Sequence, residues 1–180
     1  MDGEASEREV NNGLAHLWAG WRSTAWSATP SAMLPVQEPG CVMCRIASSP
    51  VSNGERLVVH QDEQAIVLMN LYPYTSGHLM VCPVRHTGNL GDLSDLESSA
   101  LWATILRADD AIRRTFHPDG VNVGINQGRA AGASIPDHLH VHIVPRWAAD
   151  TNFMTAVADT RVMIETVHRS YERLMEHWPA

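Results

Sequence analysis

Three histidines at alternate positions constrain this chain more than any other feature of its sequence. They stand in the run His138-Leu139-His140-Val141-His142-Ile143-Val144-Pro145. Alternate side chains of a β-strand share a face, so the three imidazoles are predicted to lie together. The apolar residues between them then form the opposite face of a half-buried strand. A face of groups that titrate near neutral pH is suited to nucleophilic catalysis, acid–base catalysis or metal binding.

Four further strands are predicted from short apolar segments bounded by turn residues. They are residues 57–60, 65–71, 78–83 and 121–127. The first two flank a polar turn, which is typical of a hairpin. Strands joined mostly by hairpins, with helices set to one side, predict an α+β domain around a five-stranded antiparallel sheet.

Two helices are predicted with different signals. Ser94 and Glu97 have the spacing of a capping box, and apolar residues recur at helical spacing from there to about Phe116. The turn residues 118–120 end this helix. The last helix is predicted from Arg161 to Trp178, where Met163, Val167, Leu174 and Trp178 form one stripe.

Length and charge limit the classes of protein to be considered. The chain has 180 residues, which suits one domain with a substantial core. Its formal net charge of -7 argues against a surface that wraps a long nucleic acid, although a local anion pocket is compatible with it. No apolar run is long enough to span a bilayer and the start is acidic and polar, so we expect a cytoplasmic protein with no membrane partner. Residues 1–13 are expected to form a disordered tail, residues 14–39 a tryptophan-rich extension and residues 40–180 the domain with its C-terminal helix.

The middle histidine is the natural nucleophile of the run. A neutral imidazole attacks phosphorus readily when its other nitrogen donates to a fixed carbonyl, which sets the tautomer and supports the developing positive charge. His140 has a neighbour on the same face at each side, and His142 is placed to contact phosphate oxygens or assist the leaving group. Spacing alone does not choose among the three.

A loop of small residues precedes the histidines. Residues 126–134 read Asn-Gln-Gly-Arg-Ala-Ala-Gly-Ala-Ser. Small residues let backbone N–H groups approach a phosphate, and Asn126 and Ser134 can add hydrogen bonds. The loop is interpreted either as a phosphate cradle or as an ordinary tight connection.

Cys41 and Cys44 have a spacing that suggests metal or redox chemistry in a reducing compartment. A structural zinc site needs four ligands, and the candidates for the other two are His86 and one histidine of the run. The alternative is a pair of reduced thiols in a turn. Cys82 lies in an apolar strand and is expected to be buried.

Together these motifs resemble the histidine triad superfamily of nucleotide hydrolases and transferases. The resemblance rests on His138-x-His140-x-His142, on Gly77-His78-Leu79-Met80-Val81-x-Pro83 and on Asn126-x-Gly128, and it runs from about Gly40 to Asn152. Within the superfamily, residues 70–74, 138–147 and 150–153 are most similar to actinobacterial proteins described as diadenosine tetraphosphate phosphorylases or hydrolases.

The resemblance implies a fold, a mechanism and a set of site residues. Two subunits would join their five-stranded sheets, with a possible further doubling to a tetramer. His140 would attack the α-phosphorus of an adenosine polyphosphate and form a nucleotidyl-histidine intermediate, which water or orthophosphate resolves. His142 and His78 would complete the catalytic set. The positions implied to bind the nucleotide or its phosphates are Asn70, Asn126, Gly132, Ser134 and His142.

The resemblance also implies a zinc ion held by Cys41, Cys44, His86 and His138, which would brace the strand that carries the nucleophile. Phosphorylases of other lineages often end their motif with Gln where this chain has His142, so phosphorolysis and hydrolysis both remain open. An adenosine phosphoramidase or nucleotidyl ester hydrolase is an alternative that keeps the chemistry and changes the leaving group. A nucleotide-binding adaptor without turnover is a further alternative.

Overall fold

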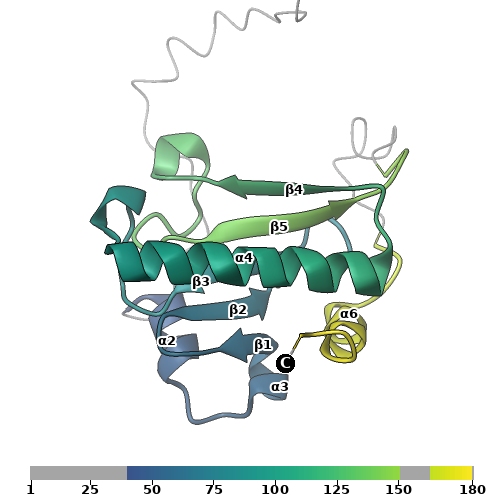
Figure 1. Cartoon of the computed structure of the whole chain (residues 1–180), viewed down its shortest axis with the longest axis horizontal. Helices are drawn as coiled ribbons and strands as arrows, with labels where there is room; N and C mark the ends of the chain where they lie inside the picture. Colours follow the sequence, from purple (N-terminus) through teal and green to yellow (C-terminus); the bar gives the residue numbers. More distant parts are fainter. Residues whose placement is uncertain (1–39, 151–162, 180) are drawn as a thin grey trace, which may run out of the picture. The chain divides into compact units, whose positions relative to one another are not determined.

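One antiparallel sheet of five strands organises the computed structural model, which describes residues 40–150 and 163–179. The strand order is β1-β2-β3-β5-β4, and every neighbouring pair is antiparallel (Figure 1). The strands are β1 (Val58–Gln61), β2 (Ala65–Met69), β3 (Leu79–Pro83), β4 (Gly120–Ile125) and β5 (Val141–Arg146). The predicted α+β class is confirmed. The expected tail and tryptophan-rich extension lie outside the described residues.

The long helix α4 (Asp95–Phe116) has the predicted bounds because its signals are local. The Ser94 side chain accepts a hydrogen bond from the Glu97 N–H, and the Glu97 carboxylate accepts from the Ser94 N–H, which completes a capping box. The helix ends where His117 enters the left-handed region at φ 48°, directly before Pro118.

The other helices differ from the sequence predictions. The C-terminal helix α6 spans Val167–Met175, so the predicted start at Arg161 and end at Trp178 are wrong. The Thr166 hydroxyl accepts from the Arg169 N–H and starts the helix there. Two short helices were not predicted, α2 (Val42–Ser48) and α3 (Asn53–Arg56). Two 3₁₀ turns, η1 (Leu90–Asp92) and η2 (Arg129–Ala131), lie in the loops.

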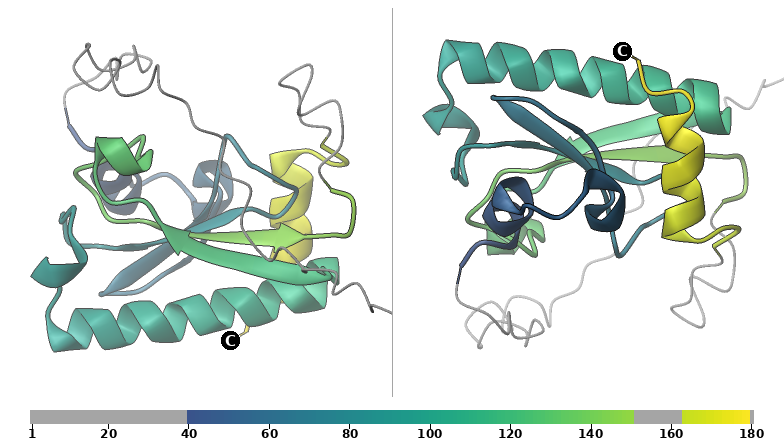
Figure 2. Two further views of the ribbon diagram at one scale, coloured as in Figure 1. Left: turned by 90° about the horizontal axis from the view of Figure 1, so that it is seen from above. Right: turned by 90° about the horizontal axis from the view of Figure 1, so that it is seen from below.

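The two faces of the sheet carry separate hydrophobic clusters. One cluster joins Leu139, Val141 and Ile143 to the buried faces of α4 and α6. The other lies on the opposite face and packs Met43 of α2 against Met80 and neighbouring residues. The expectation that the helices lie on one side of the sheet holds for α4 and α6. It is wrong for α2, which packs on the opposite face (Figure 2).

The histidine strand is shorter than predicted. Register pairs of β3 with β5 begin at Val81 and Val141, so the first two histidines of the run precede the ladder. On the N-terminal side of Val141, the Leu139 N–H donates to the Thr87 carbonyl oxygen at 2.6 Å. The Pro83 carbonyl oxygen accepts from the His138 imidazole instead of from a backbone N–H. The chain stays extended, but side-chain contacts replace the regular ladder.

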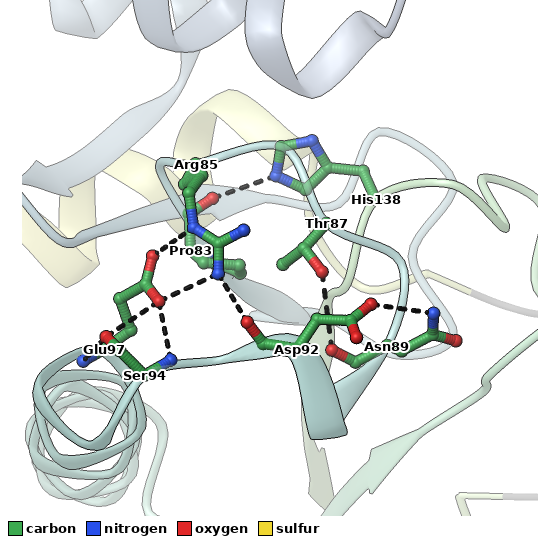
Figure 3. A network of polar contacts seen from close by, with 8 residues as sticks. All are labelled: Pro83, Arg85, Thr87, Asn89, Asp92, Ser94, Glu97 and His138. Carbon is green, nitrogen blue, oxygen red and sulfur yellow. Dashed lines mark hydrogen bonds and ion pairs between the residues drawn. The ribbon is translucent and has the colours of Figure 1, made fainter.

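An ion pair fixes the segment that follows β3 (Figure 3). Arg85 binds both carboxylate oxygens of Glu97, at 2.6 and 2.9 Å, and donates to the Asp92 carbonyl oxygen at 2.7 Å. These contacts, with the Ser94 hydrogen bonds, hold the pKa of Glu97 at about 2. The end of β3 is thereby tied to the start of α4, close to where His138 meets Pro83.

Candidate functional site

Four residues from three separate segments form a compact cluster of metal-ligand type. Cys41 stands at the N-cap of α2 and Cys44 lies within it, His86 follows β3, and His138 precedes β5. One ligand atom of each residue lies within 4.8 Å of the others. The structure thus brings together all four residues named in the zinc prediction, and thiolate and imidazole groups are the ligands that Zn²⁺ prefers.

The His138 ring is oriented so that its Nδ1 faces the thiols. Its Nε2–H donates to the Pro83 carbonyl oxygen at 2.9 Å (Figure 3), which leaves the Nδ1 lone pair 3.2 Å from the Cys41 sulfur. The Nδ1 of His86 lies 3.4 Å from the Cys44 sulfur. Burial lowers the pKa of His138, which favours the neutral form that binds metals. The residues present fit a metal ion, and the cluster could hold one.

The thiols themselves favour the same conclusion. Burial, together with the neighbouring Cys41, raises the pKa of Cys44. The Cys44 thiol therefore resists ionisation until a cation compensates its charge. Cys82 is fully buried in β3, as the sequence predicts.

The backbone fixes the tautomer of His140. Its Nδ1–H donates to the carbonyl oxygen of His138 at 2.8 Å, so the lone pair resides on Nε2. The side chains of the described residues provide no hydrogen-bond partner for that Nε2. His138 thus serves two neighbours, since its ring belongs to the metal-ligand cluster and its carbonyl orients the His140 ring.

A second chain of hydrogen bonds fixes the opposite tautomer in His142, with the hydrogen on Nε2. The Tyr74 N–H donates to Nδ1 of His78 at 3.1 Å, so Nε2 of His78 carries its hydrogen and lies 3.0 Å from Nδ1 of His142. Nε2 of His142 then carries a hydrogen as well. Burial, followed by the repulsion that a protonated His140 would exert, lowers the pKa of His142, which favours its neutral form. His140 thus has a lone pair on Nε2 and His142 has an N–H donor on Nε2. The centroids of the two rings are 5.0 Å apart.

A cavity of about 570 Å³ lies beside His142, on the face opposite α4. Of the predicted site residues, His142 and Asn126 line it. The ring of His140 does not, and this residue is only 2% exposed. A substrate in the cavity therefore meets His142 first.

The remaining predicted nucleotide-binding residues lie away from this cavity. Asn70 accepts from the Tyr72 N–H at 2.9 Å and places its amide nitrogen 3.3 Å from His78, so it supports the turn. Gly132 adopts φ +90° beside Asn126, and Ser134 is exposed in the same loop. The structure thus groups Asn126 with His142 and leaves Asn70 and Ser134 outside the cavity.

The far end of the cavity contains residues that the sequence reasoning missed. Arg146 binds both carboxylate oxygens of Asp150, at 2.6 and 2.7 Å, and donates to the Asn122 side chain at 2.9 Å. Strand parity could have indicated two of them, because Arg146 shares the face of His142 and Asn122 shares that of Asn126. The place of Asp150 depends on the turn after β5 and has no such signal.

Comparisons with known proteins identify the family of this chain. The family model described as HIT domain matches residues 52–149. The chain is 36% identical over 165 residues to a protein named AP-4-A phosphorylase from Mycobacterium tuberculosis, covering 92% of this chain and 85% of that protein. A protein named Bis(5'-adenosyl)-triphosphatase from Dictyostelium discoideum is 32% identical over 62% of this chain and 74% of its own length.

A solved structure is similar at the level of the fold. The crystal structure of a Zn-bound histidine triad family protein from Mycobacterium smegmatis superposes with a TM-score of 0.63 at 29% identity, covering 77% of this chain and 93% of that one.

In the described ranges 40–150 and 163–179, no helix combines the length and apolar character needed to cross a bilayer. From the matched model, the relatives and the shared fold, this chain belongs to the HIT domain family.

Proposed function

We propose that this protein is an enzyme that cleaves a phosphoanhydride bond of dinucleoside polyphosphates through a nucleotidyl-histidine intermediate. The relatives named AP-4-A phosphorylase and Bis(5'-adenosyl)-triphosphatase support this substrate class. The observation that carries the proposal is the 2.8 Å hydrogen bond from Nδ1 of His140 to the His138 carbonyl, because it leaves a lone pair on Nε2 and stabilises the imidazolium formed on attack.

In the first step Nε2 of His140 forms a bond to the innermost phosphorus, and the bond from that phosphorus to the leaving oxygen breaks. The leaving polyphosphate departs as an anion, and its oxygen accepts a hydrogen bond from the Nε2–H of His142, whose position is held through His78. In the second step water or orthophosphate attacks the same phosphorus, the bond from that phosphorus to Nε2 of His140 breaks, and any proton of the attacking group passes to solvent. Asn126, with the neighbouring backbone of the small-residue loop, is proposed to hold the phosphate oxygens. Gly132 and Ser134 are proposed to contribute from that loop, and Asn70 to act through the His78 turn.

The metal-ligand cluster is proposed to hold zinc through Cys41, Cys44, His86 and His138. When bound, the ion would join α2, the segment after β3 and the start of the histidine run into one unit. Within the chain itself, the His138 ring is already fixed at the Pro83 carbonyl, and this holds the His138 carbonyl that orients His140.

A homodimer is also proposed, and exposed apolar side chains support it. β4 is an edge strand with Val123 46% exposed, and α4 exposes Trp102 and Leu106 by 60% and 56%. Large apolar groups exposed on an edge strand and on a long helix favour a partner surface. Light scattering of the purified protein tests this, and a monomer at micromolar concentration would contradict it.

The test of the function is product analysis with diadenosine tetraphosphate, with and without orthophosphate. Hydrolysis predicts a nucleoside monophosphate and a triphosphate in both mixtures. Phosphorolysis predicts a nucleoside diphosphate that appears only with orthophosphate. If neither product forms, the proposed function is wrong, and binding without turnover would favour the adaptor.

A further inference from the structure

We propose that Thr75 is a positioning residue of the proposed reaction. Its hydroxyl fastens the turn between β2 and β3 to β5, and this bond keeps His142 in the tautomer that donates from Nε2. The inference rests on the proposed function, in which that N–H contacts the leaving polyphosphate. Thr75 acts through the turn and is assigned no contact with the reacting atoms.

The bond of Thr75 to β5 follows from a proline in that strand. The register of β3 with β5 ends at the pair Leu79 and Ile143. Pro145, two residues further along β5, has no N–H with which to extend the ladder. Its carbonyl oxygen remains, and because Pro145 is buried that oxygen needs a donor. The Thr75 hydroxyl donates to it at 2.8 Å, from a turn 70 residues earlier in the chain.

The same turn holds the N–H that fixes the tautomer of His78. The Tyr74 N–H donates to Nδ1 of His78 at 3.1 Å, and the Thr75 carbonyl oxygen accepts from the backbone N–H of His78 at 3.3 Å. Thr75 is thus bonded to β5 through its side chain and to His78 through its backbone. Because Tyr74 directly precedes Thr75, a shift of Thr75 moves the Tyr74 N–H away from the His78 ring.

The Tyr74 N–H decides the direction of the hydrogen bond between two imidazole rings. Nε2 of His78 lies 3.0 Å from Nδ1 of His142, and either nitrogen can carry the hydrogen of this contact. While the Tyr74 N–H occupies Nδ1 of His78, the hydrogen stays on His78 and Nε2 of His142 is a donor. In the reverse direction, Nε2 of His142 would present a lone pair to the leaving polyphosphate, and the stabilising hydrogen bond would be lost.

A second donor limits the expected size of the effect. The Asn70 amide nitrogen lies 3.3 Å from Nδ1 of His78, which is a longer contact than that of the Tyr74 N–H. The Asn70 side-chain oxygen accepts from the Tyr72 N–H at 2.9 Å, and this orients the amide nitrogen toward His78. Loss of the Thr75 hydroxyl is therefore expected to mix the two tautomers of His142 rather than to reverse them.

Three variants separate the hydroxyl from the shape of the side chain. Thr75→Val removes the donor and keeps the branched shape, which matters because Thr75 also lines the cavity beside His142. Thr75→Ser keeps the hydroxyl. Thr115→Val is the matched control, since Thr115 is buried in α4 and its hydroxyl has no hydrogen-bond partner among the described residues.

The experiment combines nuclear magnetic resonance with kinetics. Two-bond hydrogen–nitrogen correlation spectra of protein labelled at the histidine ring nitrogens report the tautomers at about pH 8, where a histidine ring is neutral. The His142 signals are identified by their absence in His142→Gln. The wild type is expected to show the hydrogen of His142 on Nε2, and Thr75→Val is expected to show a mixture of the two tautomers.

The kinetics are measured with diadenosine tetraphosphate as substrate. Thr75→Val is expected to lower kcat about tenfold and to change KM by less than about twofold, because the lost hydrogen bond acts on the leaving group in the transition state. Thr75→Ser and Thr115→Val are expected to keep both the wild-type tautomer and kcat within about twofold of the wild type.

The outcomes separate the inference from the function. If the wild type has no turnover, the proposed function fails, whereas the tautomer signals still decide whether Thr75 positions His142. If the wild type is active and Thr75→Val keeps its tautomer, the function stands and the inference is refuted, whatever happens to kcat. The inference is also overturned if Thr75→Ser behaves like Thr75→Val, because the hydroxyl is then not the cause.

Discussion

The substitution Gly77→Ala is predicted to destabilise the domain strongly, because two independent terms add. Gly77 has φ +80°, and placing an L-residue in the left-handed region costs ~1–2 kcal/mol. A Cβ there would also lie 2.6 to 2.9 Å from three atoms of the Phe116 ring. Phe116 ends α4, is 8% exposed and has the Arg173 guanidinium 5.0 Å from its ring centre, so it has little room to move.

Overpacking of this kind costs ~1–3 kcal/mol, which brings the predicted loss in the free energy of unfolding to about 2–5 kcal/mol. Urea unfolding followed by circular dichroism measures it, with the slope of the transition expected to stay unchanged. Gly91→Ala is the control, since it has open surroundings and no positive φ, and it is expected to change stability by less than ~0.5 kcal/mol. If Gly77→Ala is as stable as this control, the reasoning about the Gly77 turn is refuted.

Three further predictions follow from local contacts. Ser94→Ala is expected to cost ~1 kcal/mol in urea unfolding by removing the α4 cap, and a loss below ~0.3 kcal/mol would contradict the capping role. Cys41→Ser is expected to lower the melting temperature clearly and to change nucleotide affinity little, because a zinc ion at this cluster would act on folding. Elemental analysis that finds no zinc in freshly purified wild-type protein would contradict this prediction. Burial lowers the pKa of His142 in the folded protein, so as the pH falls the His142 ring is protonated in the unfolded chain before it is protonated in the folded one. His142 therefore lowers the free energy of unfolding as the pH falls through about 6.5. His142→Gln should weaken the fall in the free energy of unfolding as pH drops below about 6.5, and an unchanged pH dependence would count against this reasoning.

Signals confined to neighbouring residues predicted the fold most accurately. The capping box of Ser94 and Glu97 located α4 at its observed start, because both hydrogen bonds lie within one turn. The periodic stripe before α6 extended the predicted helix too far, since apolar spacing does not reveal the Thr166 cap. α2 was missed because it has only 7 residues and its N-cap, Cys41, makes no side-chain capping bond.

Contacts between distant segments account for what the sequence could not specify. The residues themselves indicated His86 as a candidate partner of the two cysteines, but only the resemblance selected His138 among the three histidines, and Cys41 and His138 are 97 residues apart. The histidine strand begins late because the Pro83 carbonyl accepts from an imidazole, which no strand pattern encodes. The Arg146–Asp150 pair likewise depends on the turn after β5, so the far end of the cavity emerged only from the fold.

The central claim is that His140 forms a covalent bond to the nucleotide. Rapid acid-free quenching of the enzyme with diadenosine tetraphosphate, followed by peptide mass spectrometry, tests it most directly. The account predicts a nucleotidyl group on His140 in the wild type, and no adduct and no turnover in a folded His140→Ala variant. Turnover by His140→Ala, or a kinetically competent adduct on His142 or another residue instead, would contradict it.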